Sequence, residues 1–188
     1  MQSTNLIIGI SGATGVIYGI RLLEVLKETG VNTHLILTEW GGKNIEIETE
    51  YSISHVKSLA TFVYDNNNLG AKVASGSFPI DGMIIAPCSM KTLSGIACGY
   101  GESLLGRAAD VSLKESRKLV LVIRETPLHI IHLENMLKVA TAGASIIPPM
   151  PAFYHHPEKI SDIIDQTIGK ILDQFRIDHQ LFRRWEGI

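Results

Sequence analysis

Short runs of apolar side chains recur along the chain at intervals that suit a sheet covered on both faces. Each run is continuous rather than alternating, which is the pattern of a buried parallel strand. A polar residue or a proline lies at the end of each run. The pattern predicts five buried strands, at residues 6–10, 31–38, 81–87, 118–124 and 144–147.

Between these runs, apolar positions recur every three to four residues, which predicts helices. Val16, Ile20 and Leu23 share one face of the first helix, and Gly30 follows it as a stop signal. The segment 65–77 is polar and glycine-rich, and we expect it to be at least partly loop. The predicted helices cover 15–29, 40–61 in two pieces with the second starting at Ser52 or Ser54, a piece capped by Ser89, about 104–115, 129–142 and 161–175.

Alternating strands and helices with short connections predict a doubly wound, mostly parallel α/β sheet with helices on both faces. Such a three-layer sandwich is of the Rossmann or flavodoxin-like type. A chain of 188 residues suits one domain. We therefore expect residues 1–188 to form a single domain, with the C-terminal helix and tail (about 161–188) packing on it or on a neighbouring subunit.

Composition excludes some function classes without naming one. The 17 basic and 19 acidic side chains give a formal net charge of −2 without a Lys/Arg-rich run, so no nucleic-acid partner is expected. No apolar stretch approaches the roughly 20 residues that span a bilayer, and the start of the chain lacks the basic segment of a signal peptide. Cys88 and Cys98 form no CxxC pair. We expect a cytoplasmic protein with reduced thiols and no membrane partner.

Sheets of this kind bind ligands at the carboxyl ends of their strands. After the first strand, Gly9, Gly12 and Gly15 form GxxGxxG rather than the GxGxxG of dinucleotide folds. Glycines permit a close backbone approach, and the following helix N-terminus offers free N–H groups to a phosphate or a flavin edge. Ser11 and Thr14 add hydroxyl donors. The alternative is a plain strand-to-helix turn without a ligand.

The third strand is followed by a second group of donors. Ser89, Lys91 and Thr92 lie where a helix begins, which suits an anion. Cys88 could act as a nucleophile, because helix N-termini lower thiol pKa values. We favour a small buried apolar role for it, since no histidine in the motif could pair with it.

Charged residues follow the second and fourth strands. Arg124 suits a phosphate and Glu125 suits proton transfer, although the two could also form a structural ion pair. Thr38 and Glu39 follow the second strand, where an acidic residue could hold a ribose or simply be a surface charge. The glycine spacing makes NAD the less favoured ligand.

The fifth strand leads into a rigid, proline-dense and aromatic loop, residues 148–157, which could line an apolar pocket. His155 and His156 are adjacent in it. Because adjacent side chains diverge, we expect them to be exposed to water rather than to share a metal. No set of three or four metal ligands is apparent elsewhere, so no metal is expected.

Six ordered motifs carry a resemblance that covers nearly the whole chain, up to the terminal RRWEGI. They are SGATG (11–15), APCSMKTL (86–93), RAADVSLKE (107–115), RETPL (124–128), HLENML (132–137) and PPMPAFYHHP (148–157). Together they resemble the flavin prenyltransferases, a family that includes UbiX of ubiquinone synthesis and the small B subunits of phenolic-acid decarboxylase systems. The second and sixth motifs lean toward the phenolic-acid branch.

The resemblance implies two ligand sites. Its FMN site would comprise Gly12, Ala13, Thr14, Thr38, Ser89, Met90, Lys91, Thr92 and Arg124. The site for dimethylallyl phosphate would comprise Arg107, Lys114, Arg124, Tyr154, Lys170 and Trp185, with Glu125, Glu48, Thr14 and Lys114 acting in catalysis. Thr14 stands where several members have serine, and Lys170 where several have arginine. Lysine lacks the flat two-point clasp of arginine, so phosphate affinity is expected to differ.

The implied reaction joins the dimethylallyl group to N5 and C6 of reduced FMN without a metal. Glu125 or the released phosphate would be the base. The product, prenylated FMN, would serve a separate UbiD-type decarboxylase. Members assemble into homo-oligomers, commonly dodecamers, with sites between subunits. Whether the donor is the phosphate or the pyrophosphate, and whether the pathway is that of ubiquinone or of phenolic acids, stays open.

Two other functions on the same fold compete with this one. A flavin-dependent decarboxylase would need a catalytic histidine near the flavin, and His55 is the one early candidate. A non-catalytic FMN-carrier subunit of an aromatic-acid decarboxylase would bind FMN without using a prenyl phosphate. The set Lys114, Arg124, Tyr154 and Lys170 argues against a carrier, which needs no second phosphate site.

Overall fold

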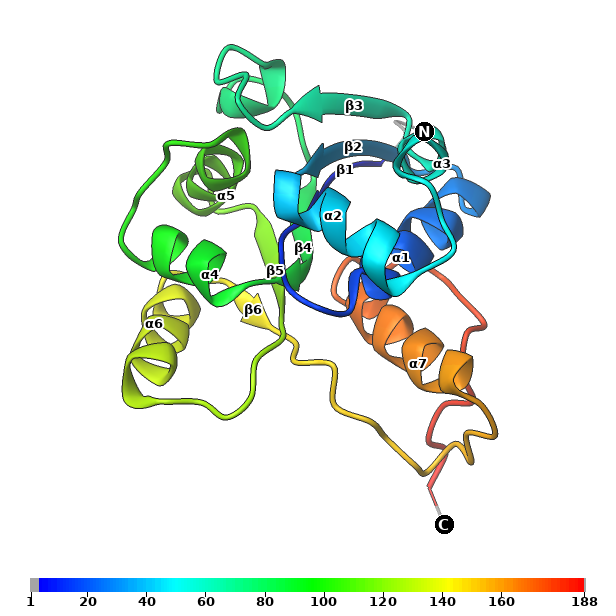
Figure 1. Cartoon of the computed structure of the whole chain (residues 1–188). Coiled ribbons are helices and arrows are strands. Elements are labelled where there is room, and N and C mark those ends of the chain that lie inside the picture. The colour runs from blue at the N-terminus through cyan, green and yellow to red at the C-terminus, as the bar shows by residue number, and fades with distance from the viewer. Residues whose placement is uncertain (1–3, 188) are drawn as a thin grey trace.

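The computed structural model describes residues 4–187, and within them the sheet has six strands, all parallel, in the order β3-β2-β1-β4-β5-β6 (Figure 1). The strands are β1 (Asn5–Ile10), β2 (Asn32–Leu37), β3 (Phe62–Asp65), β4 (Gly82–Cys88), β5 (Lys118–Ile123) and β6 (Ser145–Ile146). The prediction of a doubly wound α/β sandwich is confirmed, and the sheet is entirely rather than mostly parallel.

Helices cover both faces of the sheet. They are α1 (Val16–Glu28), α2 (Glu39–Glu48), α3 (Ile53–Leu59), α4 (Met90–Ala97), α5 (Leu104–Lys114), α6 (Ile130–Thr141) and α7 (Ile160–Asp173), with a short 3₁₀ turn η1 (Lys72–Ala74). Figure 1 shows α1 and α7 on one side and α4, α5 and α6 on the other. Each predicted helix is present, with ends within a few residues of the predicted ones.

The core consists of two apolar layers, one on each face of the sheet. In β1, Leu6, Ile8 and Ile10 pack beneath α1, whereas Ile7 joins the layer beneath α5. Successive side chains of a strand point to opposite faces. Because helices cover both faces of the sheet, the side chains on both faces of each strand are apolar. Each strand is therefore a continuous apolar run in the sequence.

The edge strand β3 was not predicted from the sequence. It has only four residues and is mostly exposed, so it carries no buried run. Its position depends on β2: Thr33 and Thr61 each donate a backbone N–H to the other's hydroxyl, at 3.1 and 3.0 Å. The ring of His34 stacks on Phe62 at 4.8 Å. Pairing with a distant segment, rather than local pattern, makes this strand.

His34 is expected to make stability fall in mild acid. Its Nδ1 lies 2.9 Å from the hydroxyl of Tyr64, and burial, with the charge of Lys72, lowers its pKa to about 4. An unfolded histidine titrates near 6.5, so below that pH the unfolded chain binds a proton that the folded chain refuses. Above pH 6.5 the neutral His34 therefore costs no stability. Between pH 6.5 and 4 we expect the free energy of unfolding to fall by about 3 kcal/mol.

Comparing denaturant unfolding of the wild type and His34→Phe across this range tests the prediction, because other groups that titrate cancel in the difference. The variant should show a flatter profile. Parallel profiles for the two proteins would contradict it.

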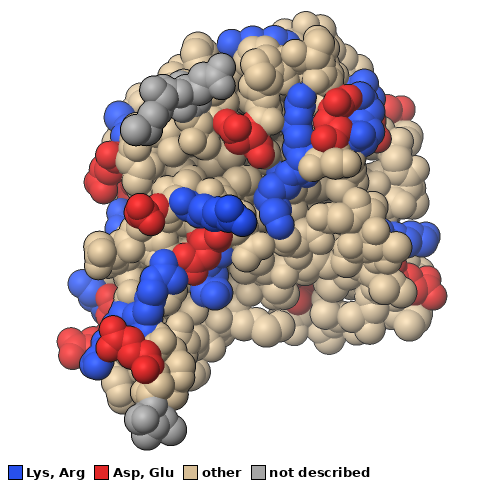
Figure 2. Space-filling model, turned by 180° about the vertical axis from the view of Figure 1, so that it is seen from behind, with Lys and Arg blue, Asp and Glu red and all other residues tan. Residues whose placement is uncertain are grey.

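The surface carries both signs of charge. On the face opposite to that of Figure 1, Figure 2 shows Lys and Arg interspersed with Asp and Glu, without a large patch of one sign. Among residues 4–187, none of the helices combines the length and the apolar character that a membrane crossing requires. The signal-peptide expectation rests on the start of the chain, and residues 1–3 lie outside the described part.

Candidate active site

The strand order reverses between β1 and β4, and sheets of this kind bind ligands at the carboxyl ends of the strands beside such a reversal. We call the carboxyl ends of β1 and β4, with the loops that follow them, the crevice. Ser11 ties the two loops together. Its hydroxyl donates to the carbonyl of Pro87 at 2.8 Å and accepts the N–H of Ser89 at 2.8 Å. The expectation that Ser11 donates to a ligand is therefore wrong. The proton of its buried hydroxyl is already donated to Pro87, and the oxygen already accepts the N–H of Ser89.

The N-terminus of α1 is also less available than predicted. One carboxylate oxygen of Glu48, the last residue of α2, accepts the N–H of Gly15 at 2.8 Å and of Val16 at 3.4 Å. A carboxylate is favourable there because it faces the positive end of the helix dipole. Gly15 has φ +92°, the left-handed conformation that glycine adopts without strain. The prediction of free N–H groups is thus wrong for these two.

Other donors around the crevice have no protein partner. Among the described residues, the backbone N–H groups of Gly12, Thr14, Met90 and Lys91 form no hydrogen bond. Thr38 caps α2, and its hydroxyl accepts the N–H of Gly41 at 3.0 Å while its own proton stays free to donate. These donors suit a phosphate or the polar edge of a flavin.

Ser89 caps α4, as the sequence predicted. Its hydroxyl accepts the N–H of Thr92 at 3.2 Å and lies 3.0 Å from the hydroxyl of Thr92. Cys88 beside it is fully buried, which raises the pKa of its thiol to about 12. The interpretation of Cys88 as a buried apolar residue is confirmed, since such a thiol is not a nucleophile near neutral pH.

Trp40, at the start of α2, is a residue of this region that sequence reasoning missed. A side chain at Gly12 would collide with the Cβ of Trp40, so glycine permits this contact between loop and helix. The indole itself is 60% exposed, with the Lys43 ammonium 4.5 Å from its ring centre. The sequence signal that could have identified Trp40 is its place two residues after Thr38, at the carboxyl end of a predicted strand.

Arg124 and Glu125 follow β5, next to the end of β4. The N–H of Arg124 donates to the carbonyl of Cys88 at 3.4 Å, which places it beside the crevice. The carboxylate of Glu125 accepts the N–H of Thr126 at 2.9 Å. No ion pair within residues 4–187 involves either side chain, so the alternative of a structural ion pair fails. Both groups are available for a ligand.

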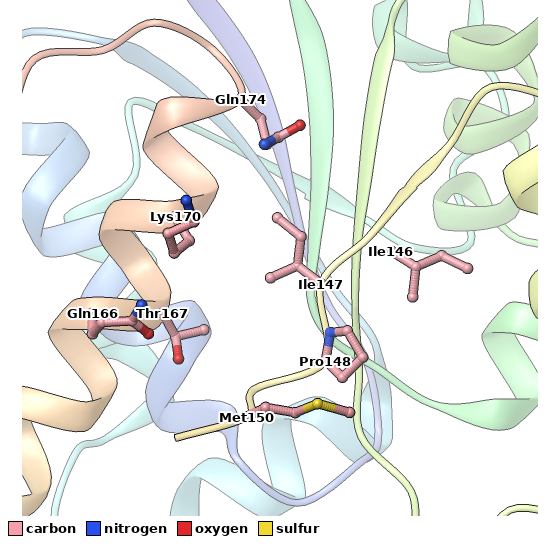
Figure 3. Close-up of a pocket in the computed structure, with 8 residues that line it drawn as sticks. All are labelled: Ile146, Ile147, Pro148, Met150, Gln166, Thr167, Lys170 and Gln174. Carbon is pink, nitrogen blue, oxygen red and sulfur yellow. The ribbon is translucent and has the colours of Figure 1, made fainter. Parts of the chain in front are cut away.

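A third set of site residues lies at α7 and the loop before it. The rings of Tyr154 and Trp185 meet edge-on, with centroids 6.2 Å apart. Lys170 on α7 and the segment after β6 line opposite walls of a cavity of about 280 Å³ (Figure 3). The cavity is lined by Ile146, Ile147, Pro148, Met150, Gln166, Thr167, Lys170 and Gln174.

His155 differs from its prediction. Both of its ring nitrogens are buried without a hydrogen-bond partner, and its ring contacts Tyr154 and Phe182. The expectation of a water-exposed histidine is wrong because the C-terminal tail folds back over the loop. His156 beside it is exposed. Among the described residues, no three His, Cys, Asp or Glu side chains group as a metal site would require.

Two predicted site residues on α5, Arg107 and Lys114, have partners within the protein. Lys114 ends α5 just before the amino end of β5, so it is at the opposite edge of the sheet from Arg124. There it pairs with Glu115. Arg107 contacts Asp110 at 2.6 Å and the carbonyl of Ala74 at 3.3 Å. One chain therefore does not bring Lys114 together with the residues at the crevice, and Arg107 is engaged by protein groups in the first turn of α5.

Comparison with known proteins adds independent information on this site. The family model described as Flavoprotein matches residues 1–174. The flavin prenyltransferase UbiX of Thauera aromatica is 55% identical over 182 residues, which span 97% of this chain and 94% of that protein.

Two solved structures are similar over their whole length. The structure of AnUbiX (PadA1) in complex with FMN and dimethylallyl pyrophosphate has a TM-score of 0.98 and 49% identity, and the match covers 100% of both chains. A dodecameric FMN-dependent UbiX-like decarboxylase from Escherichia coli O157:H7 has a TM-score of 0.96 and 52% identity, covering 98% of this chain and 100% of that one. Both similarities include the segments that form the crevice.

Proposed function

This chain belongs to the UbiX-like family of flavin prenyltransferases, and on that basis we propose that it joins a dimethylallyl group from dimethylallyl phosphate to N5 and C6 of reduced FMN. The observation that carries the proposal is Arg124, a cation at the carboxyl end of β5, the strand beside β4, with no anionic partner among the described residues. An unpaired arginine beside free N–H donors suits a phosphorylated ligand.

The residues at the crevice fit FMN. Gly12, Ala13, Thr14 and Thr38 would contact it on one side, and Ser89, Met90, Lys91, Thr92 and Arg124 on the other. Free N–H groups from both loops and the free proton of the Thr38 hydroxyl provide the donors that a phosphate and a flavin ring edge require. Reduced FMN, once bound, supplies the nucleophilic positions to which the dimethylallyl group is joined.

Cationic side chains would stabilise the departing phosphate. Arg124 and Lys170 would be two of these cations, with the Tyr154 hydroxyl as a further donor. Lys114 lies at the opposite end of the sheet, and Arg107 is held by Asp110 and Ala74 of its own chain, so we propose that a neighbouring copy supplies both cations to this site. The dodecameric relative supports such an assembly. With four cations for one leaving group, the transfer is proposed to need no metal.

The aromatic pair Tyr154 and Trp185 would exclude water from the allylic carbon and stabilise its positive charge with their ring faces. The Glu125 carboxylate would take the proton that must leave after the second bond forms. The carboxylate of Glu48 would hold the loop that bears Thr14 by capping α1. Glu125 and Glu48 thus have one proposed role each.

The product is a modified cofactor, so a decarboxylase that uses prenylated FMN is the proposed partner. We further propose that residues 1–188 form one flavoprotein domain, that the assembly is a dodecamer, and that the protein is cytoplasmic. Both cysteines are free thiols, which agrees with a reducing compartment.

The decisive assay incubates the purified protein with anaerobically reduced FMN and dimethylallyl phosphate, with and without EDTA. Mass spectrometry of the extracted flavin should show the addition of one C5H8 unit in both cases. The pyrophosphate serves as a second donor, because the similar AnUbiX structure contains it.

Unmodified FMN with both donors would contradict the proposal. Retained FMN binding would then favour the carrier subunit, and release of CO2 from an aromatic acid would favour the decarboxylase. The structure gives the decarboxylase little support, since His55 stacks on Tyr51 at 5.3 Å at the start of α3 rather than facing the crevice. Loss of transfer with EDTA alone would overturn metal independence.

A further inference from the structure

The C-terminal tail is fastened to α7 by the side chain of Asp173, the last residue of that helix. Arg184 donates two hydrogen bonds to this carboxylate, at 2.7 and 3.1 Å, and His179 contacts it at 3.2 Å. The Arg184 guanidinium holds the pKa of the Asp173 carboxyl below its usual range, so the group is ionised at neutral pH. We name Asp173, His179 and Arg184 the tail clasp.

The ring of His179 lies between the other two members of the tail clasp and the tail backbone. The N–H of Leu181 donates to Nδ1 of His179 at 3.3 Å. Nε2 of the same ring lies 3.2 Å from the Asp173 carboxylate and 3.2 Å from the Arg184 guanidinium. The side chain of His179 is only 2% exposed, so its contact with the carboxylate is shielded from water. His179 is thus the buried member of the tail clasp, whereas the side chain of Arg184 is 54% exposed.

A second contact fastens the tail independently of charge. Phe182 lies against Gly169, where a side chain on α7 would collide with the phenyl ring and would lie 2.6 Å from the ring of His179. The notch at Gly169 is therefore shaped for the folded-back tail. Figure 1 shows the tail running beside α7 toward the loop that precedes this helix.

The tail clasp lies next to the proposed donor site. Lys170 is on the same helix, and its ammonium is 3.9 Å from Asp173. Trp185 follows Arg184 directly, and its ring meets that of Tyr154 at 6.2 Å. Phe182 reaches the same loop through His155, at 6.3 Å between ring centroids. The tail therefore bridges the helix that carries Lys170 and the loop that carries Tyr154.

We propose that Asp173 is a positioning residue for the prenyl donor, which holds Trp185 against Tyr154 beside Lys170 by binding Arg184 and His179. This rests on the proposed function. Asp173 touches neither substrate itself. Its loss should release the tail, separate the two aromatic rings and open the donor site to water, while the FMN site at the crevice stays intact.

Asp173→Asn tests the proposal in the full chain. Since the donor loses a preorganised wall, we expect KM for dimethylallyl phosphate to rise about tenfold with an FMN dissociation constant within about twofold of the wild type. Hydrogen exchange of residues 178–187 should accelerate, most clearly at the Leu181 amide. The matched control is Asp165→Asn, which breaks the ion pair of α7 with Arg21 (2.7 Å) but leaves the tail alone.

Two further variants distinguish release of the tail from general unfolding of the Asp173→Asn protein. Gly169→Ala should reproduce the rise in KM by displacing Phe182, and Arg184→Lys should retain part of the donor affinity because it keeps the charge. Faster exchange in Asp173→Asn with an unchanged KM would overturn the positioning role, as would an equal rise in KM in Asp165→Asn. A wild type that forms no prenylated flavin would refute the proposed function instead, and the exchange data would still decide whether Asp173 holds the tail.

Discussion

Replacing Glu125 with glutamine is expected to stop prenyl transfer while FMN and the donor still bind. The carboxylate is exposed at the end of β5, next to Arg124 in the chain, and within residues 4–187 its one hydrogen bond is from the N–H of Thr126. Glutamine can accept that N–H through its amide oxygen, so the local structure should persist. It cannot take a proton, and loss of a general base lowers rates on the order of 100- to 10,000-fold.

Single-turnover formation of the C5H8-modified flavin measures the effect, and flavin titration measures binding. Glu134→Gln is the matched control, because Glu134 is an exposed glutamate on α6 without a partner among the described residues. It should behave as the wild type. Full activity in Glu125→Gln would remove Glu125 from the mechanism and leave the released phosphate as the base.

Lys114→Ala and Arg124→Ala are each expected to be nearly inactive alone and to recover activity when mixed. Each removes one cation from the departing phosphate, a loss on the order of 100- to 1,000-fold in rate. Within one chain the two residues lie at opposite edges of the sheet. If a neighbouring copy supplies Lys114, one intact Arg124 and one intact Lys114 can meet in a mixed assembly.

Random mixing of equal amounts should restore about one quarter of the sites, because each of the two contributing subunits is correct half the time. The two variants are dissociated, mixed, reassembled and assayed for modified flavin. Each variant carried through the same steps alone should stay inactive, and Lys138→Ala, an exposed lysine of α6, should stay active throughout. Absence of recovery in assembled mixtures would place both residues in one chain's site.

Local patterns were sufficient for most of the secondary structure. The apolar runs predicted five of the six strands, and the cap signal at Ser89 placed one helix start correctly. Of the two starts considered for α3, Ser52 rather than Ser54 is its N-cap. Such signals act within a few residues of the chain, so they can be read without knowledge of the fold. The strand β3 was not predicted because Phe62–Asp65 is short and exposed, and because it forms only by pairing with β2.

The candidate site was only partly predictable for a similar reason. Sequence identified the residues that follow each strand, and the parallel sheet places those of β1, β4 and β5 at one edge. It could not show that Ser11 binds Pro87, 76 positions away, or that Glu48 caps α1. Nor could it show that the tail buries His155.

By itself, the sequence determined the alternation of strands and helices and the doubly wound class, and it identified the residues that follow each strand. These follow from burial periodicity and from capping, which are encoded within one or two turns of the chain. Only the tertiary structure decided which polar groups are already satisfied and which remain free. Hydrogen-bond partners such as Asp173 and Arg184 meet because the tail folds back onto α7. Likewise, the sheet holds Lys114 away from Arg124, because α5 runs back to the amino edge from which β5 starts.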